Sequence, residues 1–468
     1  MKFDNRIRDN FYIFRSKIRR KIASTFLSFG LSMLDRNLTK VPNEILHRIP
    51  DLNLSITKKN RGLFELFYRN EVTAKLWFDG ECKKAIIAQK DIFSELYEYL
   101  GLNNNSHFPT FMSSNWTNRI GHFSYLGVYS KAQEMKLIPE QKRFLLRNNR
   151  EANLDLLKSV SKHFNVIDFA SGTDWTELPN FWHTFERLDI VKTNQDFMHI
   201  YELFEKVMNT RKILGEGNKP ILTLDSEYIL HSSKVIEKLG LPKDSKFVGL
   251  HIREANGTRN LRSQPINSYI PAINFIISMG YSVVRIGDRD VTKFPPMKGL
   301  IDLPASNVLT NTLDAFVLGK SSFFIGTNSG PANIPMLYGV PTLHTNSTSI
   351  GKNMLTFNQG SRYIPKVFYT KNNRKLSLSG LLDSPIAGYS EHNKDQMLKA
   401  GLKFENNSAE DILDGVKEMM EQEEKDLRQP EVSTFEKSIN EIRAEFKPIG
   451  YGDFSNSFLE KNADWFLV

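Results

Sequence analysis

The chain is 468 residues long, which is enough for two or three domains that each bury a core of their own. Its composition is that of an ordinary soluble globular protein, with 40% hydrophobic and 25% charged residues, and its net charge of +9 favours acidic partners such as phosphates, nucleotides or an anionic membrane surface. The single cysteine, Cys82, excludes an intramolecular disulfide and a cysteine-based metal site, and no stretch reaches the roughly 18 apolar residues needed to cross a bilayer.

The first predicted region, residues 1–105, is mostly helical and basic. One apolar stripe at helical spacing runs through it and consists of Phe11, Phe14, Ile18, Ile22, Phe26, Phe29 and Met33. Basic residues flank this stripe, so residues 11–34 could lie on a membrane surface, but a helix docked on the protein's own core explains the stripe at least as well. Asp4 and Asp9 argue against a signal peptide, and we expect a cytoplasmic protein that could associate with the inner face of the membrane.

From residue 106 onwards, short apolar runs alternate with helical patterns, weakly over 106–225 and more clearly over 226–430. The strands predicted in the second series are Phe247–Ile252, Ser282–Ile286 and Ser322–Ile325. Alternation of this kind predicts parallel sheets that are covered by helices on both faces. We therefore predict an α/β protein with two Rossmann-like domains that face a cleft, followed by a helical tail at 431–468.

Each predicted strand of the second series ends in polar residues. The strands lead into "HIREANGTRN" at 251–260, "GDRD" at 287–290 and "GTNSG" at 326–330. The two-residue period of a strand places His251 and Arg253 on one face. Because the carboxyl ends of parallel strands meet at one edge of a sheet, these groups would share a small volume. An exposed structural role explains any one of them, but it explains the three together poorly.

The third strand end also predicts a seat for phosphate. The apolar residues of 332–338 have helical spacing, Pro331 suits the first helical position, and Ser329 or Asn328 suits the cap. Free N–H groups at the start of such a helix can bind phosphate. The alternative interpretation is that Thr327, Asn328 and Ser329 only cap a core helix.

A nucleoside diphosphate would suit this group of residues. Arg253 offers a planar fork that can hold phosphate oxygens bidentately. Arg259 could be a second clamp, although a surface arginine is the simpler interpretation. Asp288 could accept hydrogen bonds from a base or ribose, and the Ser329 hydroxyl could bind the other phosphate. Charge that accumulates on a departing nucleoside diphosphate would then be neutralised at this edge.

Other motifs are missing or weak. No GxGxxG follows a predicted strand, so a nicotinamide or flavin enzyme is not supported. Asp288 and Asp290 have a spacing that could hold a divalent cation, but this pattern often arises by chance, and no His or Glu cluster has metal-ligand spacing. The sequence contains no recognised nucleic-acid-binding module. We therefore expect no metal, no cofactor and no nucleic acid partner.

Taken together, the motifs resemble a known family. "HIRE", "VVRIGDRD" and "LDAFVLGKSSFFIGTNSGPANIPMLYGVP" are similar to the three-part signature of the fucosyltransferase-like (HxR motif) branch of the GT-B glycosyltransferases. The chain resembles even more closely a group of bacterial glycosyltransferases that also show the Arg259-Asn260 pair, a "RIGH" loop like Arg119–His122 and an "IPK" stretch like Ile364–Lys366. The similarity is good over about 247–346, fair to about 415 and thin before 110.

The resemblance implies a metal-independent GT-B fold whose C-terminal domain binds a sugar nucleotide without a further cofactor. By position, Arg253 would hold the β-phosphate, His251 would shape the pocket and Asp288 would contact the nucleoside. The implied donor site is His251, Arg253, Arg259, Asn260, Gly287, Asp288, Thr327, Asn328, Ser329 and Gly330. Glu254 stands where the fucosyltransferases have a second arginine, so GDP-fucose is not implied as the donor.

Two residues are candidates for the base that activates the acceptor. His122 lies in a glycine-containing loop of the first domain and could take a hydroxyl proton near neutral pH, and Glu254 is its rival. We expect a glycosyltransferase that moves a sugar from a nucleotide donor to a hydroxyl of a cell-surface glycan or lipid-linked precursor. A sugar-nucleotide epimerase of the same architecture and a non-catalytic sugar-nucleotide or glycan-binding protein are the alternatives.

Overall fold

The computed structural model of the chain divides into two compact units, Met1–Asn104 and Asn105–Val468. The described residues are Leu66, Arg69, Thr73 and Leu76 and the ranges 82–99, 110–112, 116–139, 143–147, 151–168, 190–193, 197–254, 262–308, 312–348, 358–382, 401–424 and 453–465. The apolar stripe at 11–34 and the Arg259-Asn260 pair lie outside these residues.

In the first unit, the long described helix is α4 (Cys82–Tyr99). Its buried residues include Ala85, Ile92 and Phe93, whose spacing of seven and eight positions places them on one face of the helix. The apolar face of α4 is therefore buried, as helical periodicity predicts.

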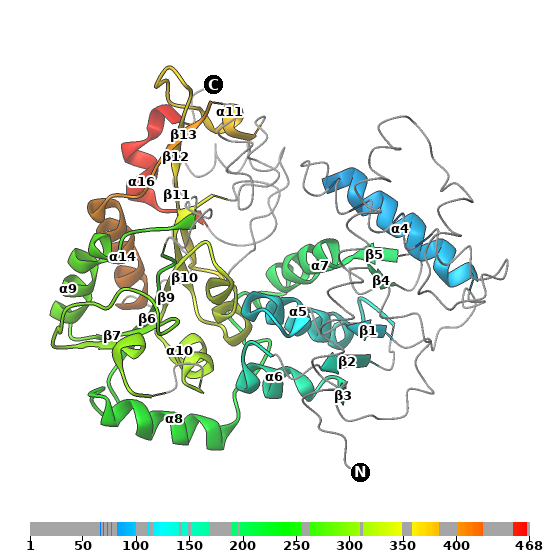
Figure 1. Cartoon of the computed structure of the whole chain (residues 1–468), viewed down its shortest axis with the longest axis horizontal. Helices are drawn as coiled ribbons and strands as arrows, with labels where there is room; N and C mark the ends of the chain where they lie inside the picture. The colour runs from blue at the N-terminus through cyan, green and yellow to red at the C-terminus, as the bar shows by residue number, and fades with distance from the viewer. Residues whose placement is uncertain are drawn as a thin grey trace, which may run out of the picture. The chain divides into compact units, whose positions relative to one another are not determined.

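The second unit contains a small and a large parallel sheet (Figure 1). The small sheet has the order β1-β2-β3, and its strands are Thr110–Met112, Arg143–Arg147 and Asn165–Asp168. The helices of this lobe are α5 (Phe123–Glu134), α6 (Leu154–Ser161) and α7 (Ile200–Ile213), and the antiparallel ribbon before α7 is β4 (Ile190–Lys192) with β5 (Phe197–His199). Both α6 and α7 pack on α5, which is buried from residue 123 to residue 130 because its side chains there are apolar or small.

Within the described residues, the large sheet has seven strands, and its neighbouring strands run parallel. In sheet order they are β14 (Asp453–Phe454), β11 (Arg362–Pro365), β10 (Thr342–Ser347), β9 (Phe324–Thr327), β6 (Phe247–His251), β7 (Ser282–Ile286) and β8 (Leu300–Asp302). A small antiparallel hairpin, β12 (Val367–Tyr369) with β13 (Lys403–Glu405), follows β11. The strands predicted from apolar runs in the second series are therefore confirmed as β6, β7 and β9, with bounds shifted by at most two residues.

Helices cover both faces of the large sheet (Figure 1). They are α8 (Ser226–Lys238), α9 (Ile270–Ser278), α10 (Asp314–Lys320), α11 (Leu378–Leu382), α14 (Ala409–Glu424) and α16 (Asn456–Lys461). Phe247 lies on the α10 side, where its ring stacks 5.9 Å from that of Phe316, whereas its neighbour Val248 belongs to the core on the α9 and α14 side. Successive residues of β6 thus point to opposite faces of the sheet, and both faces are covered. Because both faces are buried, the strand is apolar along its whole length, as in other α/β proteins, and the predicted α/β class is confirmed.

The start of α14 forms a capping box between Ser408 and Asp411. The Asp411 N–H donates to the Ser408 hydroxyl at 3.1 Å, and the Ser408 N–H donates to Asp411 Oδ2 at 2.9 Å. Two of the N–H groups that a helix start leaves without helical partners are satisfied in this way.

The C-terminal residues 431–468 are more than the helical tail that the sequence predicts. Their described part, 453–465, adds β14 to the edge of the large sheet before it forms α16. Phe454 is buried in the core beside α14, and the Ser455 N–H donates to the Tyr363 carbonyl of β11 at 2.9 Å. β14 has only two residues, so it shows no alternation of apolar and polar side chains. A sequence pattern therefore could not predict this strand.

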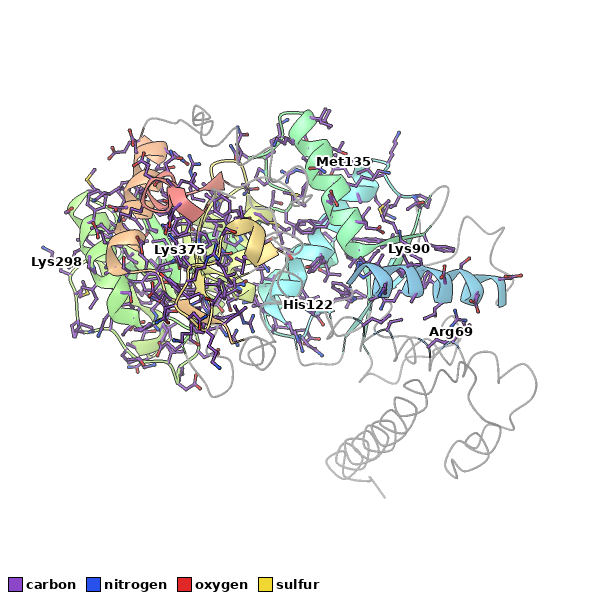
Figure 2. All side chains as sticks on the ribbon, turned by 90° about the horizontal axis from the view of Figure 1, so that it is seen from above. Arg69, Lys90, His122, Met135, Lys298 and Lys375 are labelled. Carbon is purple, nitrogen blue, oxygen red and sulfur yellow. The ribbon has the colours of Figure 1, made fainter. Side chains whose placement is uncertain are left out.

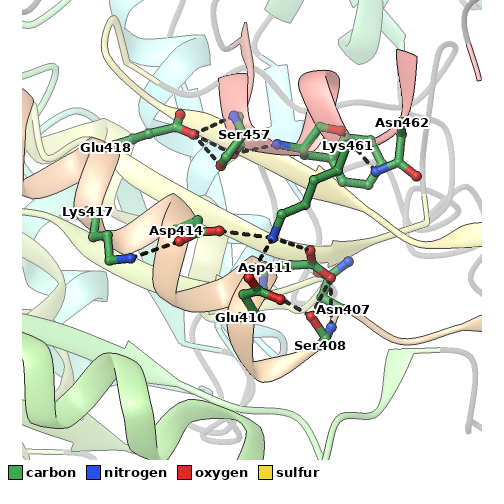
Figure 3. A network of polar contacts seen from close by, with 12 residues as sticks. Asn407, Ser408, Glu410, Asp411, Asp414, Lys417, Glu418, Ser457, Lys461 and Asn462 are labelled. Carbon is green, nitrogen blue, oxygen red and sulfur yellow. Dashed lines mark hydrogen bonds and ion pairs between the residues drawn. The ribbon is translucent and has the colours of Figure 1, made fainter. Parts of the chain in front are cut away.

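A polar network then fastens α16 to α14 (Figure 3). Glu418 accepts hydrogen bonds from the hydroxyls of Ser455 and Ser457, at 2.7 and 2.6 Å, and from the N–H groups of Asn456 and Ser457, at 3.0 and 2.9 Å. Lys461 reaches back to the acidic face of α14. We call Glu418, its partners at 455–457 and Lys461 with its carboxylates the C-terminal clasp.

Candidate functional site

The carboxyl ends of β6, β7 and β9 lie next to one another, as the sequence predicts. His251 pairs in register with Ile286 of β7 on one side and with Gly326 of β9 on the other. The Arg253 N–H donates to the Thr327 hydroxyl at 3.0 Å, which links the ends of β6 and β9. We call these strand ends, residues 251–254, 287–288 and 327–330, the polar edge.

Arg253 and Ser329 face each other across the polar edge. The distance from Arg253 Nη1 to the Ser329 hydroxyl oxygen is 3.4 Å. Ser329 is buried and Arg253 is half-buried. Asn328 is held by the residue directly after β10, because its Nδ2 donates to the Thr348 hydroxyl at 2.6 Å. A guanidinium fork beside a hydroxyl can hold the oxygens of one phosphate group together.

The segment after Ser329 is not the α-helix that its apolar spacing predicts. It forms two 3-10 turns, η9 (Gly330–Asn333) and η10 (Pro335–Tyr338). Pro335 has no N–H to donate to the Pro331 carbonyl and its ring would clash with that carbonyl, so an α-helix cannot run through it. Ser329 does precede the first turn with an extended backbone, but its side chain makes no cap hydrogen bond and faces Arg253 instead.

A loop from the lobe of the small sheet meets the polar edge at Gly330. This loop is η2 (Ile120–His122), which packs against η9 with the backbones of Gly121 and Gly330 in contact. A Cβ atom on Gly121 would lie 2.7 Å from the Gly330 Cα, and a Cβ atom on Gly330 would lie 2.8 Å from the Gly121 nitrogen. Both positions therefore need glycine, and the close approach brings the two lobes together at the third polar strand end.

His122, the first candidate base, directly follows Gly121 at the start of α5 (Figure 2). Its ring centroid lies 5.4 Å from that of Trp116 and 6.3 Å from that of Tyr125, and the side chain is half-buried. The structure thus brings the His122 loop to the polar edge from the lobe of the small sheet.

Glu254, the second candidate base, has both carboxylate oxygens engaged. Oε1 accepts from Arg285 Nη2 at 2.8 Å and Oε2 accepts from the Thr292 N–H at 3.1 Å. Arg285 is completely buried and also lies 3.4 Å from an oxygen of Asp302. Removing one partner of such a pair leaves a buried charge poorly compensated. These contacts favour a structural role for Glu254 over a role as the base.

Two further residues of the polar edge suit close contact with a ligand. His251 Nδ1 is buried and has no hydrogen-bond partner in the described part of the chain. Burial, together with the charges of Arg285 and Arg253, lowers the pKa of His251 to about 3, so the ring is neutral at physiological pH. Gly287, the residue directly after β7, has a φ angle of +152°, a conformation that other residues rarely adopt.

Asp314, which the motifs do not single out, is a further acidic residue close to Asp288. It is the first residue of α10, and its Oδ1 is buried without a hydrogen-bond partner among the residues that the structure describes. Burial and the charge of Asp288 raise the pKa of Asp314 to about 7. Near neutral pH this carboxyl group can therefore donate as well as accept a hydrogen bond. The sequence signal was a lone acidic residue inside the apolar stretch "LDAFVLG".

Within the described ranges, no group of three or more His, Cys, Asp or Glu side chains is arranged to hold a metal ion. Among the described helices, none combines the length and the apolar character that a membrane span requires.

No protein-family model and no curated protein matches the chain, but solved structures of glycosyltransferases are similar to it. The glycosyl transferase family 9 protein from Veillonella parvula has a TM-score of 0.34 and 11% identity over 55% of this chain and 85% of its own. The ADP-heptose LPS heptosyltransferase II of E. coli has a TM-score of 0.39 and 10% identity over 68% of this chain and 99% of its own. The iron-containing dodecameric glycosyltransferase TibC from enterotoxigenic E. coli has a TM-score of 0.35 and 12% identity over 69% of this chain and 77% of its own. None of the three is named as a fucosyltransferase.

Proposed function

We propose that the chain is a GT-B-type glycosyltransferase that transfers a sugar from a nucleotide donor to a hydroxyl group of an acceptor. The observation that supports this most is the pairing of Arg253 with Ser329 at the point where Gly121 of the other lobe touches Gly330. A donor diphosphate bound by Arg253 and Ser329 would lie at the boundary between the lobes. An acceptor bound by the lobe of the small sheet could then reach the sugar of the donor.

In this proposal Arg253 and the Ser329 hydroxyl bind the β-phosphate. Negative charge grows on the diphosphate as the bond to the sugar breaks, so a fixed guanidinium stabilises the transition state more than the bound donor. One preorganised donor of this kind commonly contributes about 3 kcal/mol. His251 would border the phosphates as a neutral ring, and Asp288 and Asp314 would bind polar groups of the nucleoside.

The base of the proposed reaction is His122. An imidazole can take a proton from an acceptor hydroxyl near neutral pH, and the His122 loop approaches the polar edge from the acceptor side. Glu254 is the weaker candidate because Arg285 and Thr292 already occupy its oxygens. Arg253 and the turn after Ser329 would neutralise the leaving diphosphate, so we expect turnover that needs no metal and persists in EDTA.

We further propose that the acceptor is a cell-surface glycan or a lipid-linked precursor on the cytoplasmic side of the membrane. Support comes from the chain's net charge of +9 and from the basic flank of the apolar stripe at 11–34, which suit an anionic lipid surface. The HxR resemblance makes a deoxyhexose or hexose donor the first choice.

A thermal-shift panel of GDP, UDP, CDP, ADP and their sugar conjugates tests the proposal on wild type, Arg253→Ala and the control Arg374→Ala. Arg374 is exposed in the turn between β12 and α11, away from the polar edge. A ligand at 100 times its Kd adds about 2.7 kcal/mol, which raises the melting temperature by a few degrees. We expect one nucleotide to stabilise wild type and Arg374→Ala but not Arg253→Ala.

Product analysis separates the alternatives for the nucleotide that binds. A transferase releases the nucleoside diphosphate only when an acceptor is present, an epimerase changes the sugar of the donor without an acceptor, and a binding protein does neither. No melting shift with any nucleotide would reject the assignment of Arg253 as a phosphate ligand.

A further inference from the structure

Lys366, directly after β11, is the completely buried lysine of the part of the chain that the structure describes. Its ammonium nitrogen lies 3.3 Å from the side-chain oxygen of Asn346 and contacts the side-chain oxygen of Asn406. It also lies 4.8 Å from the centroid of the Phe404 ring. No ion pair joins it to a carboxylate of the described residues, and burial lowers the pKa of Lys366 to about 7. A lysine in this cage of amides can donate hydrogen bonds whether it is charged or neutral.

Asn346, the first partner of Lys366, has an unusual backbone conformation. Its φ angle is +52°, in the left-handed region, and it lies where the register between β10 and β11 shifts from Thr345 to Ser347. Asn407 holds this bulge from the other side, because the Asn407 N–H donates to Asn346 Oδ1 at 2.9 Å and the Asn346 N–H donates to Asn407 Oδ1 at 2.5 Å. A buried residue persists in such a conformation only where its surroundings impose it.

The first connection to the polar edge runs along β10. Two residues after Asn346, the Thr348 hydroxyl accepts the 2.6 Å hydrogen bond from Asn328 Nδ2. Asn328 directly precedes Ser329, so the conformation of the bulge sets where the phosphate-facing turn lies.

The second connection runs through Gln264. Its Nε2 donates to the Asn407 carbonyl at 3.0 Å, and its backbone N–H donates to the Arg253 carbonyl at 3.0 Å. Gln264 is buried and therefore transmits the position of Asn407 to the end of β6. Lys366, Asn346 and Asn407 are thus tied to both sides of the proposed phosphate site, although none of them forms part of the polar edge.

We propose that Lys366, Asn346 and Asn407 form a positioning hub that fixes the distance between Arg253 and the Ser329 turn. This inference rests on the proposed function, in which both groups bind the donor diphosphate. Lys366 acts through Asn346 and is a positioning residue, not a catalytic one. Amide oxygens satisfy its ammonium group without placing a carboxylate close to a bound phosphate, where a negative charge would repel it. A hub that braces both groups keeps the site in one geometry before the donor arrives.

Hydrogen exchange on the full-length, ligand-free protein tests the hub directly with Lys366→Met. Lys375→Met is the control, because Lys375 lies in the following hairpin region and bonds Asp464 and Asn462 at 2.9 Å instead of the hub. We expect Lys366→Met to accelerate amide exchange at least tenfold in peptides that cover 251–254 and 326–330, with no change in α9 or α14. Unchanged protection at both strand ends overturns the proposal.

Ligand affinity separates positioning from a general loss of stability. For the nucleotide that binds wild type, Lys366→Met should weaken binding of the diphosphate at least tenfold and leave binding of the free nucleoside unchanged. Equal weakening of both ligands would mean a merely structural role and would overturn the hub. If wild type binds no nucleotide, the proposed function fails, and the exchange experiment still decides on the hub.

Two milder variants keep the test informative if Lys366→Met folds poorly, because each cuts one connection. Thr348→Val removes the hydroxyl that Asn328 bonds, and Gln264→Met removes the bond to the Asn407 carbonyl together with a local bond to the Ser268 hydroxyl. We expect Thr348→Val to accelerate exchange only at 326–330 and Gln264→Met only at 251–254. Exchange that rises at neither segment, or equally across the whole molecule, would contradict the hub.

Discussion

The C-terminal clasp and the polar edge are both dense groups of polar side chains in the lobe of the large sheet. In the clasp, the Glu418 carboxylate accepts four hydrogen bonds and Lys461 meets three carboxylates (Figure 3). At the polar edge and beside it, His251 Nδ1, Asp314 Oδ1 and Asn346 Nδ2 are buried without partners in the described residues.

This difference suggests that the clasp serves stability and that the polar edge serves ligand binding. An unsatisfied buried polar group costs about 1–3 kcal/mol, so a chain keeps such groups where another need outweighs stability. In the clasp, the Glu418 oxygens and the Lys461 ammonium group all have partners, although Asn456 Oδ1 is buried without one among the described residues, and these contacts fasten α16 to α14. At the polar edge, His251 Nδ1 leaves hydrogen-bonding capacity that a ligand could use. Changes in the clasp should therefore lower stability alone, whereas changes at the polar edge should alter binding.

The largest effect is expected from Gly330→Ala, which separates the polar edge from the other lobe. Its new Cβ atom would lie 2.8 Å from the Gly121 nitrogen and 3.0 Å from the Ile120 Cγ2, and the first of these is backbone that cannot swing away. We expect a loss of about 3 kcal/mol in the free energy of unfolding, measured in urea, together with loss of nucleotide binding.

The matched control for Gly330→Ala is Gly380→Ala in α11. Its nearest neighbours would be the side chains of Ser377 and Leu376 at 3.3 and 3.4 Å, and alanine suits a helix better than glycine. Gly380→Ala should therefore be neutral or slightly stabilising. Wild-type stability in Gly330→Ala would show that the two lobes do not depend on the glycine contact.

Glu418→Ala is the corresponding change in the clasp. It removes the acceptor for two hydroxyls and two N–H groups, all partly buried, so we expect a loss of about 2 kcal/mol in the free energy of unfolding. Affinity for the nucleotide should not change. Glu423→Ala, which removes an ion pair with the exposed Lys246, is the control and should lose less than about 1 kcal/mol. Weakened nucleotide binding in Glu418→Ala would contradict the claim that the clasp affects stability alone.

Asp314→Asn should change how stability depends on pH. Because burial raises the folded-state pKa of Asp314 from 3.8 to about 7, the folded state binds more protons than the unfolded state between these values. The contribution of Asp314 to stability is therefore fully present below about pH 4 and is lost as the pH rises through 7. An asparagine side chain cannot ionise, so the variant should gain stability relative to wild type between pH 5 and pH 8.

Urea midpoints of wild type, Asp314→Asn and the control Asp290→Asn at both pH values measure this change. Asp290 is exposed in the turn after β7, so its replacement removes the same charge without removing a buried carboxyl group. A constant difference between wild type and Asp314→Asn across the range would show that Asp314 is ionised in the folded protein throughout.

The part of the polar edge that follows from local patterns was predictable. Parallel strands bring their carboxyl ends to one edge, so the adjacency of Arg253 and Thr327 followed from apolar runs and polar strand ends alone. The turn at Ser329 was predicted at the right place, but the α-helix predicted after it was wrong. That prediction relied on the spacing of the apolar residues and ignored Pro335, whose effect on a helix can be predicted from the sequence.

Other features depend on contacts that no local pattern encodes. Glu254 meets Arg285 only because β6 and β7 are neighbours and Arg285 is turned inward within its strand. Lys366 meets Asn346 across 20 residues and Asn406 across 40, through a bulge that no period reveals. The raised pKa of Asp314 also depends on burial in the folded protein, which the sequence pattern does not show.

The smallest effect is expected at the exposed end of the clasp. The Lys461 ammonium nitrogen lies 2.9 Å from Asp414 Oδ2, 3.5 Å from Asp411 Oδ1 and 3.7 Å from Glu410 Oε1, but its side chain is 38% exposed. Water screens such pairs, so a double-mutant cycle of Lys461→Ala and Asp414→Ala should give a coupling energy of about 0.5–1 kcal/mol in urea unfolding.

Salt dependence decides whether charge or packing carries this coupling. At 1 M salt the screening length falls to about 3 Å, so a charge-based coupling should shrink markedly. The control is the cycle of Lys403→Ala and Asn373→Ala, in which an exposed lysine bonds a neutral amide oxygen at 2.8 Å and should respond much less to salt. A coupling energy at Lys461 that exceeds about 2 kcal/mol, or that does not change with salt, would contradict this prediction. Lys461 would then stabilise the fold through packed contacts, as Glu418 does. Because Lys461 touches carboxylates of α14 alone, nucleotide affinity should stay at the wild-type value in every variant of the cycle.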